Sequence, residues 1–293
     1  MVIVLLAMVL IGVLSITHGT PVRTVISPGS SDRPPPVGDS LFGEAMELYT
    51  GTHFSRGNSV TLCLNGEGTY PRLWNDISSA KQTLTVQMYY SEPGKVADEM
   101  RDRLAERARA GVRVLVLLDA FGSGPLRKTD FVEKLRASGA RVAWLRTIRW
   151  YTLNRAATRS HVRVVVIDGH IGYTGGFGLA DYWQGDGHHL KQWRESNVRF
   201  EGPAVAALQA AFVAGWAEAT GVLLTGNTFF PPAIFQPVGD KVAGLMYTIP
   251  AVGSTPAERF LALTIASAQK TLYITNSYFV PDDDFRRLLI RAR

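Results

Sequence analysis

The sequence predicts an α/β fold with a largely parallel or mixed sheet. Two runs rich in β-branched, aliphatic and aromatic residues, 83–90 and 112–119, are typical of buried strands. Between them, residues 95–110 are polar and carry apolar residues at helical spacing. Alternation of strand, helix and strand favours helices that pack against a sheet.

The same alternation continues along the chain. We expect a helix over 131–138, strands over 141–145 and 162–167, and a long Ala-rich helix over 203–219. The dipeptide Asp168-Gly169 is typical of a hairpin turn, so the chain should turn back after the strand that ends at Ile167.

The composition supports one large domain or two medium ones with hydrophobic cores. The chain has 293 residues, of which 46% are hydrophobic and 19% charged, which excludes a disordered chain or a collagen. The single cysteine, Cys63, cannot form an internal disulfide and excludes a zinc site built from cysteines. A net charge of +6 favours anionic partners such as phosphate, nucleic acid or acidic lipid.

The N-terminal residues 1–17 are nearly all apolar and carry no charge. No basic residue precedes this run and no A-x-A cleavage site follows it, so a membrane anchor fits better than a signal peptide or a buried core helix. The first charge, Arg23, follows the run, which indicates a location at the cell membrane with the rest of the chain in the cytoplasm. Several prolines predict an exposed linker over 18–58.

An internal repeat organises the remainder of the chain. Residues 79–86 align with residues 267–274, and Tyr90 then matches Tyr278. Helix-like stretches precede and follow each copy. We therefore expect one complete repeat over 59–222 and the start of a second, incomplete one over 223–293, although two ordinary strands could share these residues by chance.

The strongest candidate for chemistry is the segment 160–169. His161 and Arg163 share one face of the predicted strand by its period of two. Both would need a counter-charge at the mouth of a buried strand, and a phosphate would supply it. The imidazole can attack phosphorus while the guanidinium holds phosphate oxygens. A capped histidine at a strand end is the structural alternative. Asp168 would point away from His161.

A cluster of basic residues leads into this segment. No acidic residue occurs between positions 134 and 167, so the cluster favours a surface that attracts phosphate, with a solvated basic face as the alternative. The interleaved aromatic residues Trp144, Trp150 and Tyr151 suit a membrane interface or stacked bases. The basic residues are Lys134, Arg136, Arg141, Arg146, Arg149, Arg155, Arg159 and Arg163.

Other common motifs are missing. The chain has no H-E-x-x-H and no G-x-x-x-x-G-K-[ST]. Arg127 stands where a dinucleotide-binding loop needs its third glycine. The adjacent His188 and His189 lie in a Gly/Asp-rich stretch, which favours a solvated loop over a metal site.

Several linked segments resemble a known family. The pattern His161-x-Arg163-x4-Asp168-x6-Gly175-Gly176 is similar to the H-x-K-x4-D-x6-G-[SG] motif of the phospholipase D superfamily, and its surroundings look most like bacterial cardiolipin synthases. The other segments that resemble the family are 167–177, 193–195 with 202–203, and 278–282. The resemblance runs from about residue 60 to the end of the chain.

The resemblance implies a phospholipase D-like fold, with a mixed β-sheet flanked by helices. It implies a phosphodiester transferase that acts on phospholipids, with phosphatidylglycerol as the expected substrate. In this family two repeats face each other and each gives one motif to a shared site. One histidine attacks the phosphodiester and forms a phosphohistidine, and the other protonates the leaving group. No metal and no cofactor is required.

The resemblance also implies residue roles. His161 is expected to be nucleophile or general acid, and Arg163 takes the place of the phosphate-binding lysine. Glu195 occupies the position of the acid that orients the histidine. Asp168 matches the aspartate of the motif and is expected to have a structural or supporting role. The residues expected to bind substrate are Gly175, Gly176 and Arg159.

Three residues depart from the family pattern. Arg163 replaces lysine, which keeps the charge but changes its shape and its hydrogen-bonding geometry. Gly178 stands where the family usually has asparagine, which removes a polar side chain from the phosphate pocket. Glu195 replaces aspartate and is one methylene longer.

The second motif leaves two interpretations of the chain open. By the spacing of the repeat its histidine would follow residue 293, so the chain is a fragment of a two-motif enzyme, or two copies form a homodimer that completes one site. The partners expected are phospholipid and a membrane, with nucleic acid less favoured. A nuclease of the same superfamily and a catalytically inactive half-site are the competing functions.

Overall fold

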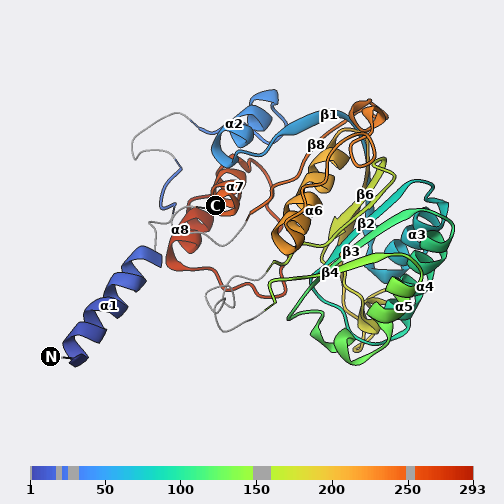
Figure 1. Ribbon diagram of the computed structural model, residues 1–293. Helices are drawn as coiled ribbons and strands as arrows, with labels where there is room; N and C mark the ends of the chain where they lie inside the picture. Colours follow the sequence, from blue (N-terminus) through green and yellow to red (C-terminus); the bar gives the residue numbers. More distant parts are fainter. Residues whose placement is uncertain (1, 18–21, 26–32, 148–159, 249–254, 293) are drawn as a thin grey trace. The chain divides into compact units, whose positions relative to one another are not determined.

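The computed structural model describes residues 2–17, 22–25, 33–147, 160–248 and 255–292 (Figure 1). The chain forms two compact units. The larger comprises Ser55–Leu245, and the smaller comprises Met1–Phe54 with Met246–Arg293.

A mixed sheet forms the centre of the larger unit (Figure 1). In the described part of the chain its strands follow the order β4-β3-β2-β5-β6-β7-β1-β8. β2, β3 and β4 are parallel, whereas β5 pairs antiparallel with β2, and β6, β7 and β1 continue antiparallel. The strands are β1 (Phe54–Leu64), β2 (Thr83–Met88), β3 (Arg113–Asp119), β4 (Arg141–Leu145), β5 (Val164–Ile167), β6 (Ile171–Gly175), β7 (Ser196–Glu201) and β8 (Lys241–Gly244).

Helices cover both faces of the sheet (Figure 1). α3 (Asn65–Ser79), α4 (Lys95–Arg109) and α5 (Phe131–Ala137) lie side by side on one face, and α6 (Ala204–Thr220) lies on the other. Short 3₁₀ turns connect these elements at Gly124–Lys128, Asp181–Trp183 and Pro232–Phe235.

The alternation of side chains in β3 explains why both faces need helices. Val116 and Leu118 belong to the core beneath α3, α4 and α5, whereas Leu115 and Leu117 pack with Phe212 of α6. A strand that is buried on both faces has a nearly continuous apolar sequence, which is the run seen at 112–119. The predicted α/β architecture with a mixed sheet flanked by helices is therefore confirmed.

The turn after β5 forms as the sequence predicted. Asp168 and Gly169 have φ angles of +52° and +66°, and β5 and β6 pair as an antiparallel hairpin around them. A φ in this region is strained for most side chains but is tolerated by aspartate and glycine. The strand itself begins at Val164 rather than at 162, so His161 and Arg163 lie just before it.

Asp168 ties this turn to the start of β2. Its carboxylate accepts hydrogen bonds from the backbone N–H groups of Lys81, Gln82 and Thr83 at 2.7–2.8 Å. The Asp168 N–H donates to the carbonyl oxygen of Thr83 at 2.9 Å. These bonds fix the register in which Ile167 of β5 faces Leu84 of β2.

The smaller unit contains α1 (Val2–Thr17), α2 (Ser40–Thr50), α7 (Pro256–Ser267) and α8 (Asp283–Ala292). The expected linker over 18–58 is corrected by α2, which has its own cap at each end. The Asp39 carboxylate accepts the N–H of Leu41 at 2.9 Å, and Gly51 ends the helix in the left-handed conformation.

Helix α1 covers the stretch expected to anchor the chain. It is 16 residues long, and its described side chains are exposed and apolar. Across the described residues, no helix combines the length and the apolar character needed to cross a membrane.

The second copy of the repeat has helices but no strand between them. α7 and α8 flank residues 271–276 as α3 and α4 flank β2, yet those residues are extended without pairing in the described chain. β2 is held by β3 on one side and β5 on the other. Residues 271–276 have no such neighbours among the strands described, and Tyr273 is 89% exposed.

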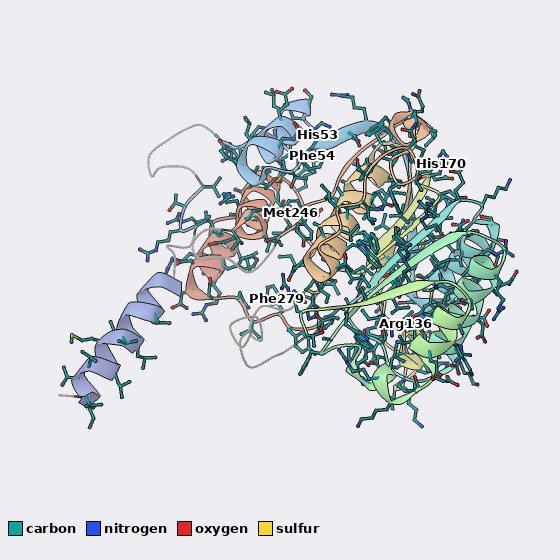
Figure 2. The ribbon with its side chains drawn as sticks, in the orientation of Figure 1. His53, Phe54, Arg136, His170, Met246 and Phe279 are labelled. Atoms are coloured by element: carbon teal, nitrogen blue, oxygen red, sulfur yellow. The ribbon has the colours of Figure 1, made fainter. Side chains whose placement is uncertain are left out.

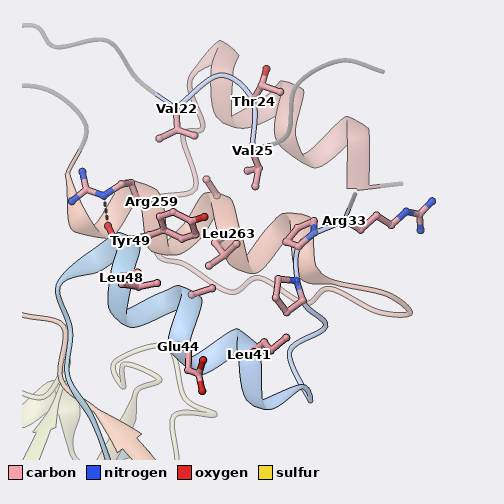
Figure 3. Close-up of a pocket in the computed structure, with 14 residues that line it drawn as sticks. Val22, Thr24, Val25, Arg33, Leu41, Glu44, Leu48, Tyr49, Arg259 and Leu263 are labelled. Atoms are coloured by element: carbon pink, nitrogen blue, oxygen red, sulfur yellow. Dashed lines mark hydrogen bonds between the residues drawn. The ribbon is translucent and has the colours of Figure 1, made fainter. Parts of the chain in front are cut away.

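The smaller unit also contains a cavity of about 570 Å³ (Figure 3). Its lining comes from α2, α7 and the segments around residues 22–25 and 33–35, and includes Leu48 and Leu263. At its edge the Nε–H of Arg259 donates to the carbonyl oxygen of Tyr49, which joins α7 to the end of α2 (Figure 3).

We predict that Asp168→Ala lowers the free energy of unfolding by about 1–3 kcal/mol, because three backbone N–H groups lose their acceptor. Urea denaturation followed by circular dichroism measures the change. Asp240→Ala is the control, since Asp240 is exposed and pairs only with its neighbour Lys241. Equal effects of the two substitutions would contradict this account of Asp168.

Candidate active site

The candidate site lies where β2 and β3 end and β5 begins. Because β5 is antiparallel to β2, Val164 at the start of β5 faces Gln87 near the end of β2. This pairing brings His161 and Arg163, just ahead of β5, to Tyr89, just beyond β2. The structure therefore brings His161 and Arg163 to the same aromatic ring, although both lie ahead of the strand on which their spacing had placed them.

His161 stacks on an aromatic ring. Its imidazole lies 3.5 Å from the ring of Tyr89, centroid to centroid, with 28° between the planes. Partial burial under this ring and the positive charge of Arg163 lower the pKa of His161, and the Asp119 carboxylate opposes them. At neutral pH the imidazole is therefore mainly neutral, which is the form that can act as a nucleophile or a base.

Arg163 lies in an aromatic setting. Its guanidinium carbon is 5.8 Å from the ring centre of Tyr89 and 5.8 Å from that of Trp183. Burial lowers the pKa of Arg163 and the charge of Glu195 opposes the shift, so the group stays a cation. Its Nε–H is buried and has no hydrogen-bond partner in the described structure. The side chain thus presents an unused donor and a positive charge, which suits an anion.

Two glycines allow β7 to approach this site closely. A Cβ atom on Gly176 would lie 1.9 Å from Oε2 of Glu195, and one on Gly175 would lie 2.2 Å from Oδ1 of Asn197. Any side chain at either position would displace these groups. The close approach of these side chains explains why glycine occupies positions 175 and 176. The role of both glycines in substrate binding stays a prediction.

Glu195 is held by Asn65 and faces Arg163. The Glu195 N–H donates to Oδ1 of Asn65 at 2.9 Å, and its carbonyl oxygen accepts from the Asn65 N–H at 2.7 Å. Its Oε1 accepts the Ser196 N–H. Between the two described side chains of Glu195 and His161 there is no hydrogen bond, so the predicted orienting role stays untested.

Asp168 is the site candidate that the fold separates from the others. It lies at the far end of β5 from His161 and binds backbone N–H groups, so it is separated from His161 by the length of the strand. Arg159, expected to bind substrate, lies outside the described residues, as do Arg149, Arg155 and the aromatic pair at 150–151.

The basic cluster is less uniform in space than in sequence. Lys134 pairs with Asp130 at 2.7 Å, and Arg146 pairs with Glu218 at 2.9 Å. Trp144 packs under the guanidinium of Arg127 at 3.9 Å. Acidic residues from outside residues 134–167 therefore neutralise part of the positive charge, and the cluster does not form a uniformly positive surface.

Three residues of the site escaped the sequence analysis: Tyr89, Asp119 and Trp183. Tyr89 follows β2 and Asp119 ends β3, so their positions at the carboxyl edge of parallel strands could have indicated them. Asp119 is 2% exposed and its Oδ2 has no partner among the residues described. Trp183 comes from a 3₁₀ turn, for which no sequence signal existed.

Comparison with known proteins places the chain in a family. Residues 73–216 match the family described as "Cardiolipin synthase, PLD-like domain". Together with the motif and the sheet, this match shows that the chain belongs to the phospholipase D superfamily and confirms the resemblance seen in the sequence.

Within that superfamily the chain is similar to cardiolipin synthases. Cardiolipin synthase A of Pseudomonas aeruginosa is 33% identical over 245 residues, which cover 82% of this chain and 48% of the relative. The major cardiolipin synthase ClsA of Bacillus subtilis is 32% identical over 232 residues, which cover 78% and 48%. The chain thus spans about half the length of these curated relatives.

A solved structure that matches is Nuc of Salmonella typhimurium, a phospholipase D family member. It is 17% identical, with a TM-score of 0.44, and the match covers 55% of this chain and 96% of Nuc.

We predict that His161 titrates below pH 6.5 and that Arg163→Gln raises its pKa, because a nearby positive charge no longer disfavours the imidazolium ion. NMR titration of the histidine ring protons measures both values, and the spectrum of His161→Ala assigns the signal. Arg109→Gln, which removes an exposed charge from the end of α4, should leave the pKa of His161 unchanged. If the pKa of His161 is the same in the wild-type chain and in Arg163→Gln, the charge of Arg163 does not act on His161 and this account is contradicted.

Proposed function

We propose that the chain is a phosphodiester transferase of the cardiolipin synthase type, which moves a phosphatidyl group from one alcohol to another. The observation that supports this most is the pair formed by His161 and Arg163. An imidazole whose pKa is lowered lies beside a half-buried cation, and attack on a phosphodiester requires such a nucleophile and such a cation.

In the proposed reaction a neutral nitrogen of His161 attacks the phosphorus of the substrate. The new N–P bond forms as the bond between phosphorus and the leaving alcohol oxygen breaks, and that oxygen takes a proton. A hydroxyl group of the acceptor then attacks phosphorus, loses its proton, and releases His161. Arg163 binds the phosphate oxygens throughout, and its positive charge stabilises the additional negative charge of the transition state.

A group other than His161 must donate the proton that the leaving oxygen takes. In the family a second histidine supplies it. We propose that a second copy of the chain can supply this acid, so that two copies face each other and each contributes His161 to a shared site.

The proposed substrate is phosphatidylglycerol. Its glycerol headgroup serves both as the leaving alcohol of one lipid and as the acceptor of the next, so two molecules yield a diphosphatidylglycerol and one glycerol. Helix α1 supports a lipid substrate, because exposed valine, leucine and isoleucine side chains along it can insert into a lipid surface.

We predict that the purified chain, mixed with phosphatidylglycerol in detergent micelles, releases glycerol and forms the diphosphatidyl product. His161→Ala should reduce the rate by about 10³-fold or more, because no nucleophile remains to form the intermediate. Mass spectrometry of the lipids and an enzymatic glycerol assay measure the two products.

His170→Ala is the matched control, since His170 is exposed on the turn at the other end of β5 (Figure 2). It should keep the wild-type rate. If two copies form the site, the specific activity should rise with protein concentration. If the chain cleaves single-stranded DNA and does not turn over lipid, its function is that of a nuclease and the transferase proposal is wrong. A wild-type chain that is inactive on both substrates at every concentration would also overturn the proposal.

A further inference from the structure

We propose that Trp183 and Gly178 together form a seat for Arg163, and that they act as positioning residues for the phosphate-binding cation. This inference rests on the proposed function and deepens it. It concerns the two positions, 163 and 178, at which the chain departs from the lysine and the asparagine that its family usually has.

The space beside Gly178 is filled by Trp183. A Cβ atom on Gly178 would lie 2.5 Å and 2.8 Å from Cζ3 and Cη2 of the Trp183 ring, and 2.9 Å from the carbonyl oxygen of Tyr90. Real side chains do not approach so closely. The indole therefore occupies the volume that a side chain at position 178 would need.

The position of both residues is fixed by their neighbours. The hydroxyl group of Tyr70 donates to the Gly178 carbonyl oxygen at 2.7 Å, and the Leu179 N–H donates to the Tyr90 carbonyl oxygen at 3.0 Å. Trp183 is 4% exposed and meets the ring of Tyr90 edge-on at 5.6 Å. The indole consequently has little freedom to move aside.

The same indole borders Arg163. The guanidinium has Trp183 and Tyr89 as aromatic neighbours, each at 5.8 Å, within the range of a cation–π interaction. A planar guanidinium stacks on aromatic rings and keeps its N–H groups free, whereas an ammonium is a compact and strongly hydrated charge. Arginine at 163, glycine at 178 and tryptophan at 183 thus form a matched set.

This arrangement predicts coupling between positions 178 and 183: a larger residue at 178 should be more harmful when Trp183 is present than when it is replaced. In the chain as it is, Gly178→Ala must displace the indole and with it Arg163. In a Trp183→Phe background the two nearest clashing atoms are gone, and the contact of 2.9 Å to the Tyr90 carbonyl oxygen remains.

The experiment compares the wild-type chain with Gly178→Ala, Trp183→Phe and the double variant. Two readouts are used: binding of orthovanadate, a phosphate analogue, by calorimetry, and the KM and kcat for phosphatidylglycerol. We expect Gly178→Ala to weaken vanadate binding and raise KM about tenfold in the presence of Trp183, with a smaller change in kcat. In the Trp183→Phe background the same substitution should have a clearly smaller effect, about threefold, because the contact with the Tyr90 carbonyl oxygen remains.

Gly124→Ala is the control glycine substitution, because nothing lies within 4 Å of the Cβ atom it would add. It should leave vanadate binding, KM and kcat unchanged. Trp183→Phe alone keeps an aromatic ring in the core and should weaken vanadate binding a few-fold while the chain stays folded, so it tests the seat even if Gly178→Ala unfolds the chain.

The outcomes separate the two proposals. Vanadate binding that shows the expected coupling without lipid turnover supports the seat and contradicts the proposed transferase. Lipid turnover with equal effects of Gly178→Ala in both backgrounds overturns the seat and leaves the transferase standing. An unaltered vanadate affinity in Trp183→Phe also overturns it.

Discussion

The antiparallel pairing of β5 with β2 is the constraint on which the candidate site depends. A parallel strand at this position would begin at the opposite edge of the sheet. Because β5 runs against β2, its first residues meet the last residues of β2, and Arg163 reaches Tyr89. The hydrogen bonds from Asp168 to the start of β2 fix the register of this pair from the other end. An aspartate remote from the chemistry thus determines where the histidine lies.

The electrostatics of the site follow from how Arg163 is buried. A half-buried cation is costly when it lacks a counter-charge, and among the described residues the rings of Tyr89 and Trp183 lie near the guanidinium while no carboxylate forms an ion pair with it. The negative charge of Glu195 offsets part of this cost. A phosphodiester would supply the remaining counter-charge. The incompletely compensated charge of Arg163 therefore favours the binding of an anionic substrate. Partial burial and the positive charge of Arg163 both lower the pKa of the neighbouring His161, which favours the neutral form that a nucleophile needs.

Much of the fold could be predicted from the sequence because its strands are buried on one or both faces. The apolar runs indicated β2, β3 and β5, and the Asp168-Gly169 dipeptide marked the hairpin. These are local properties, which a short stretch of sequence determines. The family motif added residue roles that geometry alone would not have supplied.

The features that could not be predicted depend on contacts between distant segments. The extended residues 271–276 share a pattern with β2, but a pattern cannot form a strand without neighbours to pair with. Proline content suggested a linker as far as residue 58, while the caps at Asp39 and Gly51 delimit a helix within it. Trp183 reaches the site only because its turn packs over Gly178, a contact that no spacing along the chain reveals.

The central claim is that phosphorus becomes bonded to His161 during turnover. The most direct test stops the reaction with phosphatidylglycerol at neutral pH within its first turnovers and maps covalent adducts by peptide mass spectrometry. The account predicts a phosphatidyl group on the peptide that contains His161, and its disappearance when an acceptor alcohol is added in excess. Product formation without an adduct on that peptide, or with the phosphatidyl group on another residue, would contradict it.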